Sequence, residues 1–337
     1  MKKWAIAICS IFCCILSIMT CCNFGTVYAD NELQIDAKSS LLMDFDSGVV
    51  LFEDNADEKV PVASIVKLMT VLLTMEEIDA GNLSLEDNLT STEYASSMGG
   101  SQVFIDPYVE YSIGDMLKSV IVASANDASV ALAERISGSE QAFVTKMNKR
   151  AKELGLNNTN YVNASGLPEP GQYSTARDVA KLFKEVINHK LYFEYSTIWM
   201  DSLTHPSGRK TEVVNTNKLI RYFKGCDAGK TGSTDEAGYC LVATAEKGNM
   251  RLISVVLGAT TSTARFNESS KLLNYGFNNF ENKQIVDVCE SVGEIKVAKS
   301  KIENVKVYAE ENYFAVNKRG EELEYSIDIA LVDKLTA

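Results

Sequence analysis

One segment of this chain is apolar on almost every side and still contains a lysine. Residues 62–75 read VASIVKLMTVLLTM, and apolar residues continue to Ile78 before Gly81. Pro61 stands just before the segment, so the pattern predicts one helix over 62–78. Because a helix that is apolar all round must be covered on every side, we expect it to be the buried central helix of a sizeable domain.

The sequence around this helix predicts an α+β fold. A strand pair about a turn at Asp46-Ser47-Gly48 precedes it, and a hairpin about Lys247-Gly248-Asn249 lies near the end of the domain. We therefore expect an antiparallel sheet built from both ends of the domain, with helices between and on both faces. Helical patterns run over 113–138 with a break at SANDAS, 140–156, 174–187 and, after the second hairpin, 268–277.

The length of 337 residues allows one large domain and a smaller one. We predict the large domain over 30–279. After it come short, charged strand patterns such as EIKVAK, KVYAEE and YSIDIALV, which predict a small β domain over 280–337.

Residues 1–29 have the layout of a secretory signal peptide. Lys2 and Lys3 precede a long apolar run, and Val27-Tyr28-Ala29 places small residues at the positions that a signal peptidase reads. We predict cleavage before Asp30 and an exported, extracytoplasmic protein, secreted or held in the cell envelope. The formal net charge of −12 argues against nucleic acid or an anionic membrane surface as a partner recruited by charge.

Five of the eight cysteines lie in this leader. A lipoprotein with Cys21 or Cys22 lipidated is the alternative, but SIMTCC lacks the residues expected before such a cysteine. The mature chain keeps Cys226, Cys240 and Cys289, which lack the paired spacing of a zinc site. If the strands around residue 233 form a hairpin, Cys226 and Cys240 could face each other. We hypothesise a disulfide there, with buried free thiols as the alternative.

The two histidines limit the catalytic chemistry that this chain can use. His189 lies in polar sequence at a helix end and His205 precedes Pro206, so we expect both at the solvated surface. No G-x-S-x-G surrounds a serine, so a Ser-His-Asp triad has no support. No H-E-x-x-H or similar cluster predicts a metal.

A lysine in a helix can replace histidine as the base. Ser64 and Lys67 form an S-x-x-K, and residues three apart on a helix share a face. A lysine amine titrates near 10.4 in water, and burial or a second cation lowers that pKa. The chain has a second S-x-x-K, Ser207 to Lys210 in HPSGRK, which lies in a polar, turn-like stretch. We interpret this second motif as a chance match.

Two further motifs follow in order. Ser124-Ala125-Asn126 is an S-x-N at the break between two predicted helices. Lys230-Thr231-Gly232 is a K-T-G on a predicted strand, where the missing side chain of Gly232 would let a substrate lie against the strand. Each motif has a plain structural alternative, but all three in this order are far less expected by chance.

This set of motifs resembles the active-site signature of the penicillin-recognising serine enzymes. It is most similar to the low-molecular-weight penicillin-binding proteins that are D-alanyl-D-alanine carboxypeptidases, peptidase family S11. The resemblance extends through SANDASVALAE, GQYSTARD and KTGSTDEAGYC. It implies that Ser64 is the acylated nucleophile, Lys67 its base and Ser124 the proton shuttle.

The same resemblance implies the substrate-binding residues. Asn126 would hold the substrate amide, Lys230 would keep Lys67 neutral, and Thr231 and Arg265 would engage the substrate's terminal carboxylate. The backbone N–H groups of Ser64 and Ser233 would form the oxyanion hole. Ser233 follows Gly232, at a position that is often histidine in relatives.

The implied reaction is acyl transfer to Ser64 from peptidoglycan stem peptides that end in D-Ala-D-Ala, with β-lactams as covalent inhibitors and no metal or cofactor. Family members usually end in an amphipathic helix that lies on the membrane. No such segment follows IALVDKLTA, so a membrane anchor is not evident in this chain. A shorter secreted form and an incomplete sequence both account for this departure.

Two alternatives share the motifs. A class A β-lactamase adds an E-x-x-L-N, which ELGLN over 153–157 matches literally. That string continues a predicted amphipathic helix, so we prefer the carboxypeptidase. A catalytically silent wall-binding module would keep the fold, but Ser64, Lys67, Ser124 and Lys230 are all present.

Overall fold

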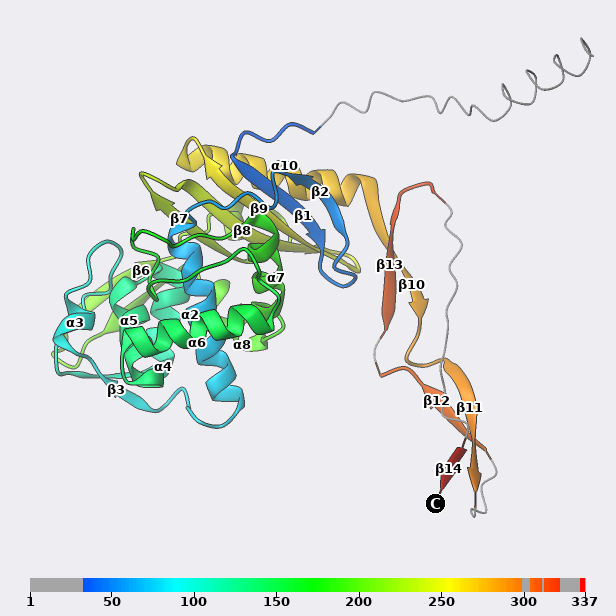
Figure 1. The fold of residues 1–337 in the computed structure, drawn as a ribbon, viewed down its shortest axis with the longest axis horizontal. Helices are drawn as coiled ribbons and strands as arrows, with labels where there is room; N and C mark the ends of the chain where they lie inside the picture. The colour runs from blue at the N-terminus through cyan, green and yellow to red at the C-terminus, as the bar shows by residue number, and fades with distance from the viewer. Residues whose placement is uncertain (1–32, 299–303, 311, 322–333, 337) are drawn as a thin grey trace, which may run out of the picture. The chain divides into compact units, whose positions relative to one another are not determined.

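The computed structural model describes residues 33–298, 304–310, 312–321 and 334–336 (Figure 1). The predicted signal peptide, 1–29, lies outside the described residues, so its cleavage stays a prediction. Among the described residues, no helix combines the length and the apolar character needed to cross a membrane.

A five-stranded antiparallel sheet forms the centre of the large domain, in the order β2-β1-β9-β8-β7. The first two strands come from the start of the domain and the other three from its end, which confirms the predicted α+β arrangement. Among the residues that the structure describes, β7 pairs with β8 alone and forms an edge of this sheet. The strands are β1 (Ser39–Asp44), β2 (Val50–Asp54), β7 (Cys226–Thr234), β8 (Gly238–Lys247) and β9 (Met250–Ala259).

The predicted central helix is present but begins as a 3-10 turn. Turn η1 (Ala63–Val66) leads into α2 (Lys67–Asp79), whose first nine residues are all buried. Helix α10 (Ser262–Asn279) packs on one face of the sheet and α7 (Ala176–Val186) on the other (Figure 1). Helix α2 packs against α7 and against α6 (Glu140–Glu153). An apolar helix with one lysine is therefore enclosed as expected.

The remaining helices also follow the sequence pattern. The break at SANDAS separates α4 (Ile113–Ala123) from α5 (Asn126–Ser137). Helix α7 (Ala176–Val186) begins with Thr175 as its N-cap, whose side chain accepts a bond from the Asp178 N–H. The short helices are α3 (Glu93–Ser96), α8 (Lys190–Ser196) and α9 (Leu219–Tyr222).

Small hairpins complete the described chain. Strand β3 (Asn88–Thr90) pairs with β4 (Glu110–Ser112), and β5 (Met200–Thr204) pairs with β6 (Lys210–Val214). After residue 279 all described elements are strands, as predicted: β10 (Phe280–Val286), β11 (Ser291–Ala298), β12 (Asn304–Tyr308), β13 (Tyr313–Lys318) and β14 (Lys334–Thr336). The division into two domains at this point stays a prediction.

The hypothesised disulfide between Cys226 and Cys240 is wrong, because both thiols are free and buried. The predicted hairpin does form, but its register separates them. Cys240 lies opposite Gly232, whereas Cys226 lies opposite Ala245 at the far end of the strand pair. Burial raises the pKa of the Cys226 thiol to about 12 and that of Cys240 to about 11.

Candidate active site

Ser64 and Lys67 lie together where the 3-10 turn passes into α2. The Lys67 amine donates a hydrogen bond to the Ser64 hydroxyl over 3.0 Å and another to the Ser165 carbonyl. Lys67 has no exposed surface, whereas Ser64 is partly exposed. Burial lowers the pKa of Lys67 well below its usual value, and the positive charge of Lys230 lowers it further. A neutral amine held against a hydroxyl can accept its proton.

A second serine–lysine pair connects the S-x-N and K-T-G motifs. The Lys230 amine donates to the Ser124 hydroxyl at 2.6 Å and to the Thr231 carbonyl at 2.9 Å. Lys230 is almost completely buried in β7, and Thr231 beside it is 5% exposed. Burial, followed by the nearby Arg265 charge, lowers the pKa of Lys230 to about 7.

Two residues of the site hold backbone conformations that side chains disfavour. Ala63, just before Ser64, has a φ of 49°, and Ser124 has a φ of 61°. Left-handed residues other than glycine cost of order 1–3 kcal/mol and persist where the surroundings hold them. The strained backbone therefore lies directly before the residue that carries the Ser64 hydroxyl and at the residue that carries the Ser124 hydroxyl.

Two glycines let other segments approach Ser64 closely. A Cβ on Gly232 would lie 2.7 Å from the Val62 carbonyl oxygen and 3.0 Å from the Ser64 nitrogen. A Cβ on Gly166 would lie 2.2 Å from the Ala63 carbonyl oxygen. Strand β7 and the 163–167 segment thus pack directly against the turn that carries Ser64. Ser233 follows on β7 and is exposed.

Asn126 is the first residue of α5, and in its side-chain amide the nitrogen is hydrogen-bonded. Its side-chain nitrogen donates to the Gly99 carbonyl at 2.6 Å, and its backbone N–H donates to the Ser101 carbonyl at 2.7 Å. Its side-chain oxygen is buried and has no hydrogen-bond partner among the described residues. An unpaired buried acceptor is costly unless a bound molecule supplies the donor.

Arg265 lies behind the K-T-G strand. Its guanidinium donates to the Gly232 carbonyl at 3.0 Å and is placed between the rings of Tyr239 and Phe266. It is 9% exposed, and burial lowers its pKa. Its charge therefore acts on the strand and on Lys230, and its contact with a substrate carboxylate stays a prediction.

The motifs that we set aside lie elsewhere. Ser207 and Lys210 are exposed at the turn between β5 and β6. Glu153, from the E-x-x-L-N string, ends α6 and forms an ion pair with Arg150 at 3.4 Å. Its side chain is about half exposed, so it does not share the buried setting of Ser64 and Lys67.

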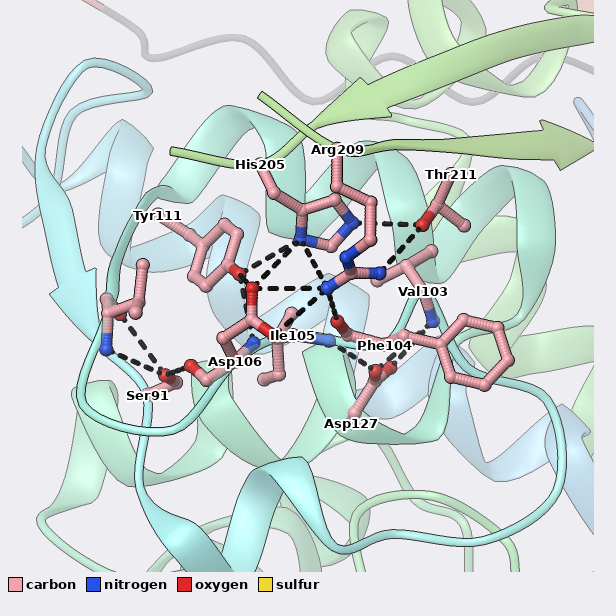
Figure 2. Close-up of polar contacts among 11 residues, drawn as sticks. Ser91, Val103, Phe104, Ile105, Asp106, Tyr111, Asp127, His205, Arg209 and Thr211 are labelled. Atoms are coloured by element: carbon pink, nitrogen blue, oxygen red, sulfur yellow. Dashed lines mark hydrogen bonds and ion pairs between the residues drawn. The ribbon is translucent and has the colours of Figure 1, made fainter. Parts of the chain in front are cut away.

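The prediction of a solvated His205 is wrong. Its side chain is fully buried, with Nδ1 3.0 Å from the Tyr111 hydroxyl and Nε2 2.9 Å from the Thr211 hydroxyl (Figure 2). The β5–β6 turn folds it against Tyr111, a contact that the local sequence does not encode. Burial and the Arg209 charge lower the pKa of His205. His189 is partly exposed and pairs with Asp79 at 2.7 Å.

Sequence reasoning missed several groups around the site. The Ser165 carbonyl binds Lys67, and the Asn163 side chain shapes this turn by accepting from the Gly166 N–H at 2.7 Å. Asp127, next to Asn126, is fully buried. A turn-forming Asn-Ala-Ser-Gly and an acidic residue after S-x-N were the available signals. Within the part of the chain that the structure describes, no three or more His, Cys, Asp or Glu side chains are grouped to hold a metal.

Comparison with known proteins agrees with this arrangement. The family model for peptidase S11, described as D-alanyl-D-alanine carboxypeptidase, matches residues 26–261. The carboxypeptidase DacF of Bacillus subtilis is 42% identical over 308 residues, which cover 91% of this chain and 79% of that protein.

Solved structures show the same fold. Penicillin-binding protein 5 from Haemophilus influenzae superposes with a TM-score of 0.75 at 36% identity and covers 85% of this chain and 84% of its own. Penicillin-binding protein D2 from Listeria monocytogenes, in its ampicillin-bound form, gives 0.62 at 35% identity over 73% of this chain and 99% of its own. The chain therefore belongs to peptidase family S11 and is a serine-type D-alanyl-D-alanine carboxypeptidase.

Proposed function

We propose that this enzyme removes the terminal D-alanine from peptidoglycan stem peptides through an acyl-enzyme on Ser64. The observation that carries this proposal is the hydrogen bond of 3.0 Å from a fully buried Lys67 amine to a partly exposed hydroxyl. Burial and the Lys230 charge favour the neutral amine, which is the form that accepts a proton.

In the first step the Ser64 oxygen attacks the carbonyl carbon between the two D-alanines, and the Lys67 amine takes the hydroxyl proton. The negative charge that develops on the carbonyl oxygen faces the N–H groups of Ser64 and Ser233. The C–N bond then breaks as Ser124 gives its hydroxyl proton to the leaving D-alanine amine and takes in exchange the proton held by Lys67, which becomes neutral again. The Ser124 hydroxyl accepts from Lys230 at 2.6 Å, so its own proton is free to point at the leaving group.

In the second step water attacks the acyl carbon and gives a proton to Lys67, and Lys67 returns it to the Ser64 oxygen as the C–O bond breaks and the shortened stem leaves. Substrate binding uses the edge strand β7. Asn126 offers its unpaired side-chain oxygen to a substrate N–H. Thr231, with the charge of Arg265 behind it, receives the terminal carboxylate, and Gly232 leaves room for the peptide.

β-Lactams would acylate Ser64 as mimics of the D-Ala-D-Ala bond. Relatives of this fold are named for penicillin binding, and one is solved with ampicillin bound. We also propose that the protein acts outside the cytoplasm. The leader-like residues 1–29 and a substrate that belongs to the cell wall both support this placement.

The test is release of D-alanine from diacetyl-Lys-D-Ala-D-Ala by the parent protein and by Ser64→Ala. We expect release from the parent and none above background from the variant. Equal release from both would refute Ser64 as the nucleophile. Nitrocefin separates this function from a β-lactamase: we expect slow turnover with a long-lived acyl-enzyme, and turnover at hundreds per second would contradict it.

A further inference from the structure

One buried carboxylate beside the site has no role in the reaction described above. Asp127 is the second residue of α5 and has no exposed surface. Its two oxygens accept the backbone N–H of Val103 at 3.1 Å and that of Ile105 at 3.2 Å (Figure 2). They also accept the backbone N–H of Ala128 at 2.8 Å. The carboxylate thus holds the segment around residue 104 against the start of α5.

The same segment holds the substrate-binding amide. The Gly99 and Ser101 carbonyls accept from the Asn126 side chain and backbone. Gly100 between them comes so close that a Cβ there would lie 2.8 Å from the Asn126 side-chain nitrogen. Asp127 binds one end of the 99–105 segment, and Asn126 is bound by the other end.

The outer side of this segment is also fixed. Arg209, from the β5–β6 turn, donates to the Phe104 carbonyl at 2.6 Å and pairs with Asp106 at 3.0 Å (Figure 2). Phe104 between these anchors has a φ of 59°, which a residue with a side chain rarely adopts. A strained backbone persists where the surroundings hold it, and here Asp127 holds it from inside and Arg209 from outside.

We propose that Asp127 is a positioning residue of the carboxypeptidase: its carboxylate fixes the 99–105 segment, whose carbonyls in turn fix the Asn126 amide for the substrate. This inference rests on the proposed role of Asn126. The position demands a side chain that only accepts hydrogen bonds, because N–H groups reach both oxygens. Asparagine would turn an NH2 group toward one of these donors.

Asp127 also acts on the base by charge. The charged groups that act on Lys67 are Lys230, which lowers its pKa, and Asp127, which raises it. Removing the carboxylate therefore moves the ionisation of Lys67 to lower pH. A carboxylate that serves folding without acting on Lys67 would leave this ionisation unchanged.

The test uses the full chain and measures the rate of acylation by fluorescent penicillin against pH, with thermal unfolding alongside. For Asp127→Asn we expect acylation to fall about tenfold or more, because a displaced binding group costs rate steeply. We also expect the acid limb of the profile to move to lower pH. Asp127→Glu keeps the charge and changes the reach, so its limb should stay near that of the parent while its rate remains low.

Asp178→Asn is the matched control. Asp178 is 4% exposed and accepts from the Asn158 N–H and the Thr159 hydroxyl, both at 2.8 Å, so it too is a buried carboxylate that holds a loop. It should lose thermal stability and keep the parent's acylation rate and pH profile. The proposal is overturned if Asp127→Asn behaves like this control.

Two further outcomes separate the questions. If Asp127→Asn does not fold, the exposed Arg209 provides a second variant. For Arg209→Gln we expect acylation to be two- to fivefold slower, with the acid limb at the same pH as in the parent. An unchanged rate overturns the proposal. If Ser64→Ala labels as well as the parent, the proposed function fails. If Ser64→Ala is not labelled and Asp127→Asn is acylated as the parent is, the proposed function stands and only the positioning role of Asp127 is refuted.

Discussion

Two S-x-x-K motifs in this chain share their spacing and differ in everything around them. Ser64 and Lys67 lie between a 3-10 turn and a helix that is closed off from water, while Ser207 and Lys210 lie at the exposed turn of the β5–β6 hairpin. In the first motif the amine reaches the hydroxyl at 3.0 Å. In the second motif both side chains are exposed to solvent.

We infer from this difference that enclosure, more than spacing, prepares Lys67 for its proposed role as a base. Lys67 is covered by the sheet, by α5 and by the 163–167 segment, which supplies the Ser165 carbonyl as a second acceptor. A second buried cation, Lys230, acts on it as well. The hairpin motif has no such cover, although its four residues satisfy the same pattern.

The largest expected effect comes from removing each lysine in turn. Lys67→Met should lower the rate of acylation by fluorescent penicillin by roughly 10²–10⁴-fold, the usual contribution of a general base. Lys210→Met should leave the rate at the parent's value. Comparable losses in both variants would show that enclosure does not distinguish the two motifs.

A smaller effect is expected from the glycines next to each motif. Gly166 and Gly208 both have positive φ, 79° and 84°, so alanine costs about 1–2 kcal/mol of folding free energy at either position. A Cβ at Gly166 also meets the Ala63 carbonyl, whereas one at Gly208 meets nothing within 4 Å.

Gly166→Ala should therefore lose a further ~1–3 kcal/mol from overpacking. Its acylation should slow by up to about 100-fold, since it displaces the turn that carries Ser64. Gly208→Ala should lose only the folding free energy that a side chain costs at positive φ, and it should keep the activity of the parent. Denaturant unfolding and penicillin labelling measure the two quantities, and equal unfolding free energies for the two variants would rule out the close approach at Ser64.

The smallest effect is a change in pH dependence. Acylation should fall as pH drops through the Lys67 pKa, because a protonated amine accepts no proton. Lys230, whose pKa is about 7, carries its charge below that pH and lowers the Lys67 pKa. Lys230→Met removes the cation, so the Lys67 pKa rises and the acid limb moves to higher pH.

The plateau rate of Lys230→Met should also be lower, because Ser124 loses its 2.6 Å partner. Lys210→Met serves as the control and should keep the limb of the parent. Since Asp127→Asn moves the limb in the opposite direction, the two variants check one another. A limb that stays fixed in both would mean that neither charge sets the ionisation of Lys67.

Most of the fold could be predicted because its signals are local. The Asp46-Ser47-Gly48 turn, the break at SANDAS and the Thr175 cap are each written in a few neighbouring residues. That the sheet takes its strands from both ends of the domain followed from where the strand patterns lie along the chain.

The errors concern contacts between distant segments. His205 is buried because it meets Tyr111, 94 residues away, and no local pattern predicts that meeting. The cysteines fail to pair because the hairpin register, set by its turn, places them opposite other residues. The backbone acceptor of Lys67 is 98 residues along the chain, so it carries no sequence signal of its own.

The sequence by itself determined which chemical groups this protein has and which element carries each: a serine and lysine on one helical face, a serine and asparagine at a helix break, and a lysine on a strand. Only the tertiary structure decided which of the two serine–lysine pairs is enclosed. The spacing of two side chains is a property of a helix or turn, whereas the pKa of an amine depends on how much water and charge surround it, and these are set by segments from the whole chain.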